Sequence, residues 1–259
     1  MLRTVLATRY VTPLREGGSL PAIIEADDDG TYVLKFRGAG QGQRALIAEL
    51  VAGEIGRALG LLVPEIVLVE LDPVLARSEP DPEIQALIEA SGGLNLALDY
   101  LPGSIGFDPL LAPPPDPDLA AAVVWFDAYV TNVDRTIKNP NLLLWHTKVW
   151  LIDHGASLFF HHSWDNYLQR SRAPFPRIKD HVLLPTAASI EKVDAHLARL
   201  LPREKLEEIV AAIPETWLGD EPLFAGIGEH RDAYLTYLVG RLDAPRAFAE
   251  DAEHAREQL

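Results

Sequence analysis

The chain has 259 residues and contains no cysteine, which excludes disulfide bonds, thiolate catalysis and cysteine-based zinc sites. Hydrophobic residues make up 48% of the chain, so it carries enough apolar surface to fold around a core, and disorder is not expected. A formal net charge of −15 repels phosphate backbones, so general nucleic-acid binding is not expected.

Most of the predicted strands lie in the first part of the chain. Runs of β-forming residues predict strands at 5–12, 22–25, 32–36, 64–71 and 94–101. Residues 27–30, Asp-Asp-Asp-Gly, are typical of a hairpin turn. Apolar residues at helical spacing predict a long helix over 43–62, and a shorter helix is predicted around 83–90.

The second half of the chain is predicted to be mostly helical. Helices are predicted at 119–130, 190–201, 202–213 and 229–242, with a weaker one from residue 244. The helix over 119–130 is apolar on most sides and is therefore expected to be buried. Short strands are predicted at 141–144 and 149–152, and residues 161–187 look irregular. Strands gathered in one half and helices in the other indicate an α+β fold.

Polar residues suited to phosphoryl transfer follow the buried helix. Asp134 and Asn139 lie in a loop, and Asp153 follows the second of the two short strands. Phosphoryl transfer needs a carboxylate near the attacking hydroxyl and oxygen ligands that hold Mg²⁺ on the phosphates. Magnesium takes only one or two protein ligands, and Asn139 and Asp153, brought together across a hairpin, fit this demand. Gly155 would let the backbone turn sharply beside them. Alternatively, these residues only shape turns and caps.

This segment resembles the catalytic and metal loops of HipA-like kinases, and also the Asp-Arg loop of phosphatidylinositol kinases. The resemblance implies that Asp134 is the catalytic residue and that Asn139 and Asp153 hold magnesium. Arg135 matches the phosphatidylinositol-kinase version of the loop, whereas HipA usually has a His there. The chain is therefore expected to be a divergent relative.

Lys35 follows a hairpin and precedes the long helix, as the phosphate-binding lysine of kinases does. The resemblance implies that Lys35 contacts the α- and β-phosphates of ATP. Its acidic partner is Glu49 or Glu54, both on the long helix. The helical wheel places Glu54 on the core-facing stripe, but the family pattern of a Glu that precedes Gly-Leu, here Gly60-Leu61, favours Glu49.

Two further segments are candidate nucleotide contacts. Gly17, Gly18 and Ser19 form a turn whose backbone N–H groups could cradle phosphates, although the turn lacks the full glycine spacing of a phosphate loop. The strand end at 96–103 resembles a kinase hinge, whose backbone at Asp99 and Leu101 would hydrogen-bond adenine. The alternative for this second segment is an ordinary strand end followed by a turn.

Three histidines near Asp153 are candidate metal ligands. His154 follows the candidate metal ligand, and His161 and His162 lie shortly after it. No further ligand spacing supports zinc, so we expect these side chains to be polar residues on the loop surface.

The resemblance also implies a function and an architecture. We expect a bilobed protein-kinase-like fold, with a small β-rich N-lobe with one long helix at 1–101 and a mostly helical C-lobe at 102–259. We expect an ATP- and Mg-dependent phosphotransferase acting on an unidentified protein or small-molecule hydroxyl. The alternatives are a nucleotide-binding pseudokinase, a nucleotidyl transferase on the same fold, and an acidic interaction protein. No long apolar run or secretion signal is apparent, so we expect a cytoplasmic protein with no membrane partner.

Overall fold

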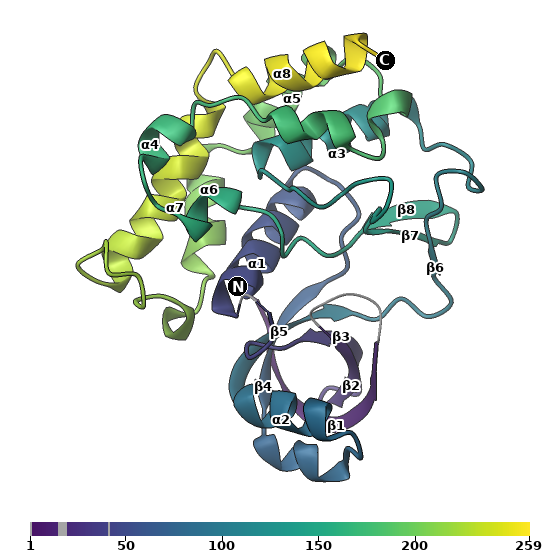
Figure 1. The fold of residues 1–259 in the computed structure, drawn as a ribbon, viewed down its shortest axis with the longest axis vertical. Coiled ribbons are helices and arrows are strands. Elements are labelled where there is room, and N and C mark those ends of the chain that lie inside the picture. The colour runs from purple at the N-terminus through teal and green to yellow at the C-terminus, as the bar shows by residue number, and fades with distance from the viewer. Residues whose placement is uncertain (1, 15–19, 41) are drawn as a thin grey trace.

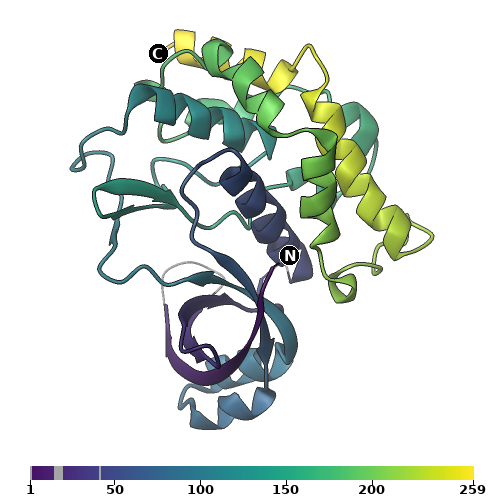
Figure 2. The same cartoon turned by 180° about the vertical axis from the view of Figure 1, so that it is seen from behind.

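A computed structural model describes residues 2–14, 20–40 and 42–259. The architecture is mixed α/β, with a small barrel of strands at one end of the molecule and a group of helices at the other (Figure 1). One long helix, α1 (Gln43–Ala58), lies between the two parts, and the view from behind shows the same arrangement (Figure 2). Elements from the first part of the chain therefore meet those from the second around α1.

Five strands form the closed barrel, in the order β1-β2-β3-β5-β4. Their bounds are β1 (Thr4–Pro13), β2 (Ala22–Ala26), β3 (Thr31–Lys35), β4 (Ile66–Leu71) and β5 (Gly93–Asp99). All neighbours are antiparallel except β1 and β4, which pair in parallel and close the barrel. The sequence predicted strands in these places, but it did not show that they close on themselves.

Alternating side chains give the strands of the barrel one buried face. Ile24 and Leu34 are fully buried, and their neighbours along each strand are more exposed. Successive side chains of a strand point to opposite faces, so inward Leu34 requires that Lys35 point away from the barrel interior. The short helices η1 (Pro73–Ser78) and α2 (Pro82–Ala90) contribute Ala76 and Ile88 to the same core.

Helix α1 ends earlier than the periodicity predicts. The predicted helix ran to residue 62, whereas the observed helix ends at Ala58. Gly60 has a φ of 81°, and the N–H of Leu61 donates to the carbonyl oxygen of Gly56 at 3.0 Å. A glycine in the left-handed region closes the final turn and stops the helix, because the chain can no longer continue the α-helical hydrogen bonds.

The remaining elements follow the predicted order, with helix α3 (Pro117–Tyr129) buried at the centre of the helical group. Residues 161–187 are less irregular than expected, because they carry short helical turns. The other elements are β6 (Ile105–Gly106), β7 (Leu142–Trp145), β8 (Lys148–Leu151), η2 (Phe159–His162), α4 (Tyr167–Arg170), η3 (Pro176–Asp180), η4 (Leu184–Thr186), α5 (Ile190–Leu200), α6 (Arg203–Ala211), η5 (Glu215–Trp217), α7 (Ile227–Leu242) and α8 (Ala247–Glu257).

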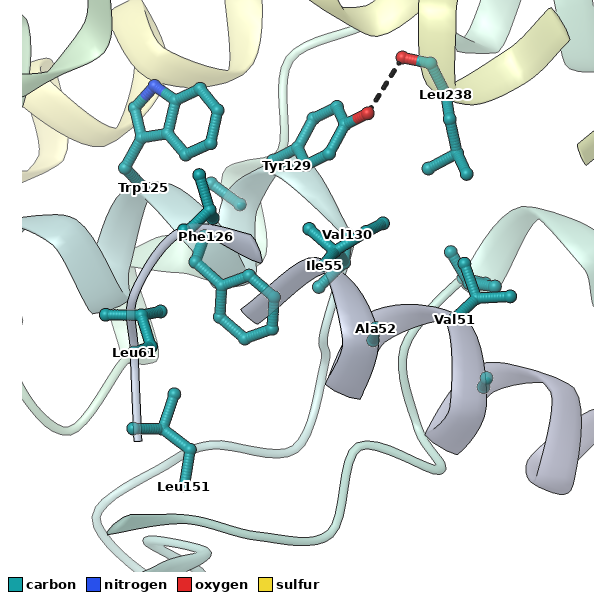
Figure 3. Close-up of a cluster of buried hydrophobic side chains, with 14 of the residues drawn as sticks. Val51, Ala52, Ile55, Leu61, Trp125, Phe126, Tyr129, Val130, Leu151 and Leu238 are labelled. Carbon is teal, nitrogen blue, oxygen red and sulfur yellow. Dashed lines mark hydrogen bonds between the residues drawn. The ribbon is translucent and has the colours of Figure 1, made fainter. Parts of the chain in front are cut away.

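The main core joins α1 to the helical group. Val51 and Ile55 of α1 lie in one apolar cluster with Phe126 and Tyr129 of α3 (Figure 3). The Tyr129 hydroxyl donates to the carbonyl oxygen of Leu238 on α7 at 3.0 Å, which satisfies the one polar atom that this ring buries. Helix α1 therefore packs as part of the main core, and its Gly53 also lies against Ile66 of β4.

Among the helices of the described residues, none is both long and apolar enough to cross a bilayer.

Candidate active site

Lys35, at the end of β3, lies between two carboxylates. Its Nζ is 2.5 Å from Glu49 Oε2 and 2.6 Å from Asp153 Oδ1. Burial alone would lower the pKa of Lys35, but the two carboxylates raise that pKa above its ordinary value. The alternative partner, Glu54, instead forms an ion pair with Arg57 on the same helix at 3.3 Å. The structure thus joins Lys35 to Glu49 and leaves Glu54 outside the cluster.

Glu49 is a charged group held in the interior. Its side chain has no exposed surface. Burial would raise the pKa of its carboxyl, but the charge of Lys35 and hydrogen bonds from Lys35 and His154 outweigh this effect, so the pKa lies well below its ordinary range. Glu49 therefore stays ionised and holds the Lys35 ammonium in place.

Asp153 lies shortly after β8, and its backbone conformation is left-handed. Its φ of 53° lies in the left-handed region, whereas Gly155, the expected turn residue, has no positive φ. A Cβ built on Gly155 would lie 3.6 Å from Asp153 Oδ1 and 3.7 Å from Glu49 Oε2, which is ordinary contact. The backbone does turn at Gly155, since the N–H of Ser157 donates to the carbonyl oxygen of His154 at 2.9 Å, but the left-handed residue of this segment is Asp153 rather than the glycine.

The loop after α3 brings Asp134 and Asn139 together. Asn139 Nδ2 donates to Asp134 Oδ2 at 2.7 Å. The backbone N–H of Asp134 donates to Asn132 Oδ1 at 3.1 Å, and Asn132 Nδ2 donates to Asp127 Oδ1 at 2.8 Å. The orientation of Asp134 is thus tied through Asn132 to the end of the buried helix α3.

A buried ion pair beneath this loop was not identified from the sequence. Arg135 Nε lies 2.6 Å from Asp127 Oδ2, and neither side chain is exposed. His181 Nε2 lies 2.9 Å from the same carboxylate oxygen. Burial would raise the pKa of Asp127, but the charge of Arg135 and the hydrogen bond with His181 bring that pKa well below its ordinary range. A carboxylate near the end of a helix that is apolar beyond its first turn, shortly before an arginine, is the sequence pattern that could have indicated the pair.

Arg135 also connects the two loops that carry the candidate site. Its Nη1 donates to the carbonyl oxygen of Asn141 and to that of Ile152, the latter at 3.3 Å. Ile152 immediately precedes Asp153. The guanidinium therefore links the backbone next to Asp134 to the backbone next to Asp153, and these two carboxylates are positioned by one buried residue.

Four of the predicted site residues line one cleft of about 310 Å³. They are Lys35, Asp134, Asn139 and Asp153, which come from the barrel, the loop after α3 and the end of β8. The rest of the lining consists of Phe36, Ala39, Gly40, Ala45, Leu46, Val133, Gly155, Ala156, Phe159 and His162. A cation, two carboxylates and an amide thus converge from distant parts of the sequence.

The other predicted nucleotide contacts lie elsewhere. Asp99 and Leu101 line a separate depression of about 410 Å³, beside the loop after α1 and next to Trp145 and Trp150. The backbone N–H of Asp99 donates to the carbonyl oxygen of Glu65 at 2.8 Å. Their role in binding adenine stays a prediction. Gly17, Gly18 and Ser19 lie outside the described residues.

Oxygen atoms suitable for a magnesium ion are present in the cleft. The Asp153 side chain is 44% exposed, and only its Oδ1 is bonded to Lys35. Asn139 uses its amide nitrogen toward Asp134, which leaves its carbonyl oxygen for a ligand. One carboxylate oxygen and one amide oxygen fit a cation that prefers hard oxygen ligands and retains several waters.

The expectation for the histidines was partly wrong. His154 and His161 are fully buried, and each ring contacts a residue distant in sequence. His162 is half-buried and lines the cleft. His161 Nδ1 lies 3.1 Å from the Tyr234 hydroxyl, and burial lowers the pKa of this histidine. Within the described part of the chain, no three His, Cys, Asp or Glu side chains are grouped as a metal site.

The fold defines the class of protein. The crystal structure of a Helicobacter pylori proinflammatory kinase, CtkA, superposes with a TM-score of 0.58 at 12% identity, covering 100% of this chain and 99% of that one. The Golgi casein kinase superposes with a TM-score of 0.51, also at 12% identity, covering 98% of this chain and 74% of that one. Both similarities indicate a protein-kinase-like fold.

The sequence identifies the family. The family model described as HipA-like kinase matches residues 8–238, so the chain belongs to the HipA-like kinase family. The expected resemblance to HipA-like kinases is thereby confirmed. A comparison with curated proteins found no match.

Proposed function

We propose that this chain is an ATP- and Mg-dependent phosphotransferase that transfers the γ-phosphoryl group to a hydroxyl. The observation that carries the proposal is the convergence of Lys35, Asp134, Asn139 and Asp153 on one cleft. Membership of a kinase family supports the same reaction. In this proposal, residues 1–101 and 102–259 act as two lobes, and the acceptor is an unidentified protein or small molecule.

Each residue has a role that its contacts support. Lys35, held by Glu49, would neutralise and orient the α- and β-phosphates of ATP. Asp153 and Asn139 would hold magnesium, which when bound supplies positive charge to the phosphate oxygens. The Lys35–Asp153 contact would then be shared with the nucleotide, because the ammonium can donate to phosphate as well as to carboxylate.

Asp134 would act on the acceptor. Its carboxylate would orient the hydroxyl and take its proton as the oxygen attacks the γ-phosphorus, while the bond to the β-phosphate oxygen breaks and ADP leaves. Hydrogen bonds from Asn139 and from its own backbone to Asn132 hold Asp134 in one orientation. A carboxylate fixed in this way can position the acceptor without a rearrangement during the reaction.

The test is a mutation at the catalytic position combined with intact-protein mass spectrometry after incubation with Mg-ATP. Asp134→Asn should keep nucleotide affinity nearly unchanged while transfer falls by at least about a hundredfold, because a positioned base contributes ~10²–10⁴-fold. Asp180→Asn changes an exposed aspartate of a nearby segment and serves as the matched control.

The mass added to the protein, or to an acceptor, distinguishes the reactions. A phosphate supports phosphotransfer, whereas an added AMP indicates nucleotidyl transfer on the same fold. Mg-ATP binding without either product indicates a pseudokinase. Undiminished transfer by folded Asp134→Asn protein would contradict the assigned role of Asp134.

A further inference from the structure

His154 makes two contacts with the carboxylate that holds Lys35. Its backbone N–H donates to Glu49 Oε2 at 2.9 Å, and its ring Nδ1 lies 3.3 Å from Glu49 Oε1. The two residues are 105 positions apart in the chain, so the contacts join α1 to the segment after β8. Any residue except proline at position 154 could supply the backbone contact, whereas the second contact comes from the histidine side chain.

The second contact is the important one for Glu49. Its Oε2 receives both Lys35 Nζ and the backbone N–H of His154. Within the described residues, the only partner of Oε1 is His154 Nδ1. The Glu49 side chain has no exposed surface, so no bulk water can replace a lost donor at Oε1.

The surroundings of the ring fix which atom faces Glu49. The His154 ring is fully buried and packs edge-on against Phe126 of α3, with ring centroids 5.8 Å apart and an interplanar angle of 72°. Its Nε2 is buried and has no hydrogen-bond partner within the described part of the chain. An ionised carboxylate only accepts hydrogen bonds, so the contact with Oε1 requires the proton on Nδ1.

We propose that His154 is a positioning residue that holds the Glu49 carboxylate toward Lys35, and that it does so through its side-chain hydrogen bond rather than through packing alone. This inference rests on the phosphotransferase function proposed above. It makes α1 and the candidate metal loop one unit, because the residue that follows Asp153 also fixes the acid on α1. Loss of the ring nitrogen should therefore impair nucleotide binding even though His154 does not line the cleft.

Two substitutions separate hydrogen bonding from packing. His154→Phe keeps an aromatic ring against Phe126 and removes the donor. His154→Asn removes the ring and places an amide nitrogen close to the position of Nδ1. The affinity for Mg-ATP, measured by calorimetry, should fall about tenfold to a hundredfold in His154→Phe, the range of a lost hydrogen bond to a charged group. His154→Asn should recover most of that loss.

A coupled substitution tests the partner. Glu49→Gln weakens the same interaction, so the double variant with His154→Phe should lose much less affinity than the product of the two single losses. Independent losses would contradict the assignment. Affinity in His154→Phe equal to or tighter than in His154→Asn would overturn the inference, because packing would then be the only role of the ring.

A measurement without nucleotide keeps this inference separate from the proposed function. Hydrogen exchange of the amides of α1 around Glu49 should be faster in His154→Phe than in wild type, and close to wild type in His154→Asn. If wild-type protein binds Mg-ATP but transfers no group, the proposed function fails while this comparison still decides the role of His154. Equal exchange in all three proteins would overturn the positioning role.

Discussion

The Lys35 ammonium and the Asp153 carboxylate lie 2.6 Å apart, although 118 positions separate the two residues in the chain. The contact joins the end of a barrel strand to the backbone that follows the last strand of the three-stranded sheet β6-β7-β8. Because Glu49 contacts the same ammonium, two carboxylates neutralise Lys35 before any phosphate arrives. Under the proposed function, a nucleotide would compete with Asp153 for this cation, so substitution of either residue should change nucleotide affinity.

Replacement of Lys35 should weaken the stabilisation that Mg-ATP gives. A ligand that binds only the native state stabilises it by RT ln(1 + [L]/Kd), which is about 2.7 kcal/mol at a hundredfold excess over Kd. Lys35→Ala should reduce the rise in melting temperature, with each variant compared with its own nucleotide-free form. Lys179→Ala, at an exposed position, is the control. An unchanged rise in Lys35→Ala would remove Lys35 from the phosphate site.

Asp153 should matter more than Asn139 for the metal. Asp153→Asn removes the charged oxygen ligand and should abolish most of the gain in nucleotide affinity that Mg²⁺ provides, whereas Asn139→Ala should have a smaller effect. Titrations of each variant with ATP, with Mg²⁺ and with a chelator, measure this gain. Full Mg-ATP affinity and turnover in Asp153→Asn would show that the metal assignment is wrong.

The buried Asp127–Arg135 pair should dominate the stability of the loop that carries Asp134. Asp127→Asn leaves Arg135 without its counter-charge and should lower the free energy of unfolding by about 3–5 kcal/mol at pH 7. The exposed pair of Arg203 and Glu207 provides the control, since Arg203→Ala should cost less than about 1 kcal/mol. Urea unfolding measures both.

The same pair predicts a pH dependence. Because folding lowers the pKa of Asp127, its contribution is fully present above the unfolded-state pKa near 4, and it is lost as the pH falls below that value. The difference between wild type and Asp127→Asn should therefore be constant from about pH 7 to pH 5 and should shrink below about pH 4. A difference that grows on acidification would contradict the assigned sign.

Arg241 should be essential for the stability of the fold, because its guanidinium pairs with buried backbone acceptors rather than with a carboxylate. Its guanidinium is buried and donates to the carbonyl oxygens of Ala128 and Tyr129 at 2.8 Å, at the C-terminal end of α3. Arg241→Met would leave these two acceptors unpaired, and each buried unpaired group costs about 1–3 kcal/mol, so we expect a total loss of at least about 2 kcal/mol. Arg199→Met, at an exposed position, should change stability by less than about 0.5 kcal/mol. Thermal unfolding of the two variants checks the contrast.

Local sequence patterns predicted most helices and strands, because the spacing of apolar residues close in sequence shows which face of each element is buried. The turn over 27–30 and the buried helix α3 both appear where these patterns indicated. Barrel closure was not predictable in this way, because the parallel pairing of Val5 with Val69 depends on residues far apart. Helix α1 ended early because a single left-handed glycine outweighed the apolar repeat.

The candidate site was predictable where residue types are tied to a reaction, as for Asp134 and Asp153. Its supporting residues were not, since nothing local shows that Asp127 meets Arg135 or that His154 meets Glu49. These contacts depend on tertiary packing, since His154 after β8 contacts both Glu49 of α1 and Phe126 of α3. Sequence reasoning therefore indicated candidate site residues that line one cleft, but it did not indicate the buried residues that hold them.

The closed barrel has a consequence for synthesis on the ribosome. The β1-β2-β3 sheet can form early, but β3 pairs with β5, and β4 is held between β5 and β1. Until residue 99 has emerged, the nascent sheet has open edges, and unpaired strands are templates for pairing with other chains. A chain that stalls or is cleaved before residue 99 should therefore aggregate. A longer chain can pair β3 with β5 and β4 with β1, and these pairings leave the barrel without open edges.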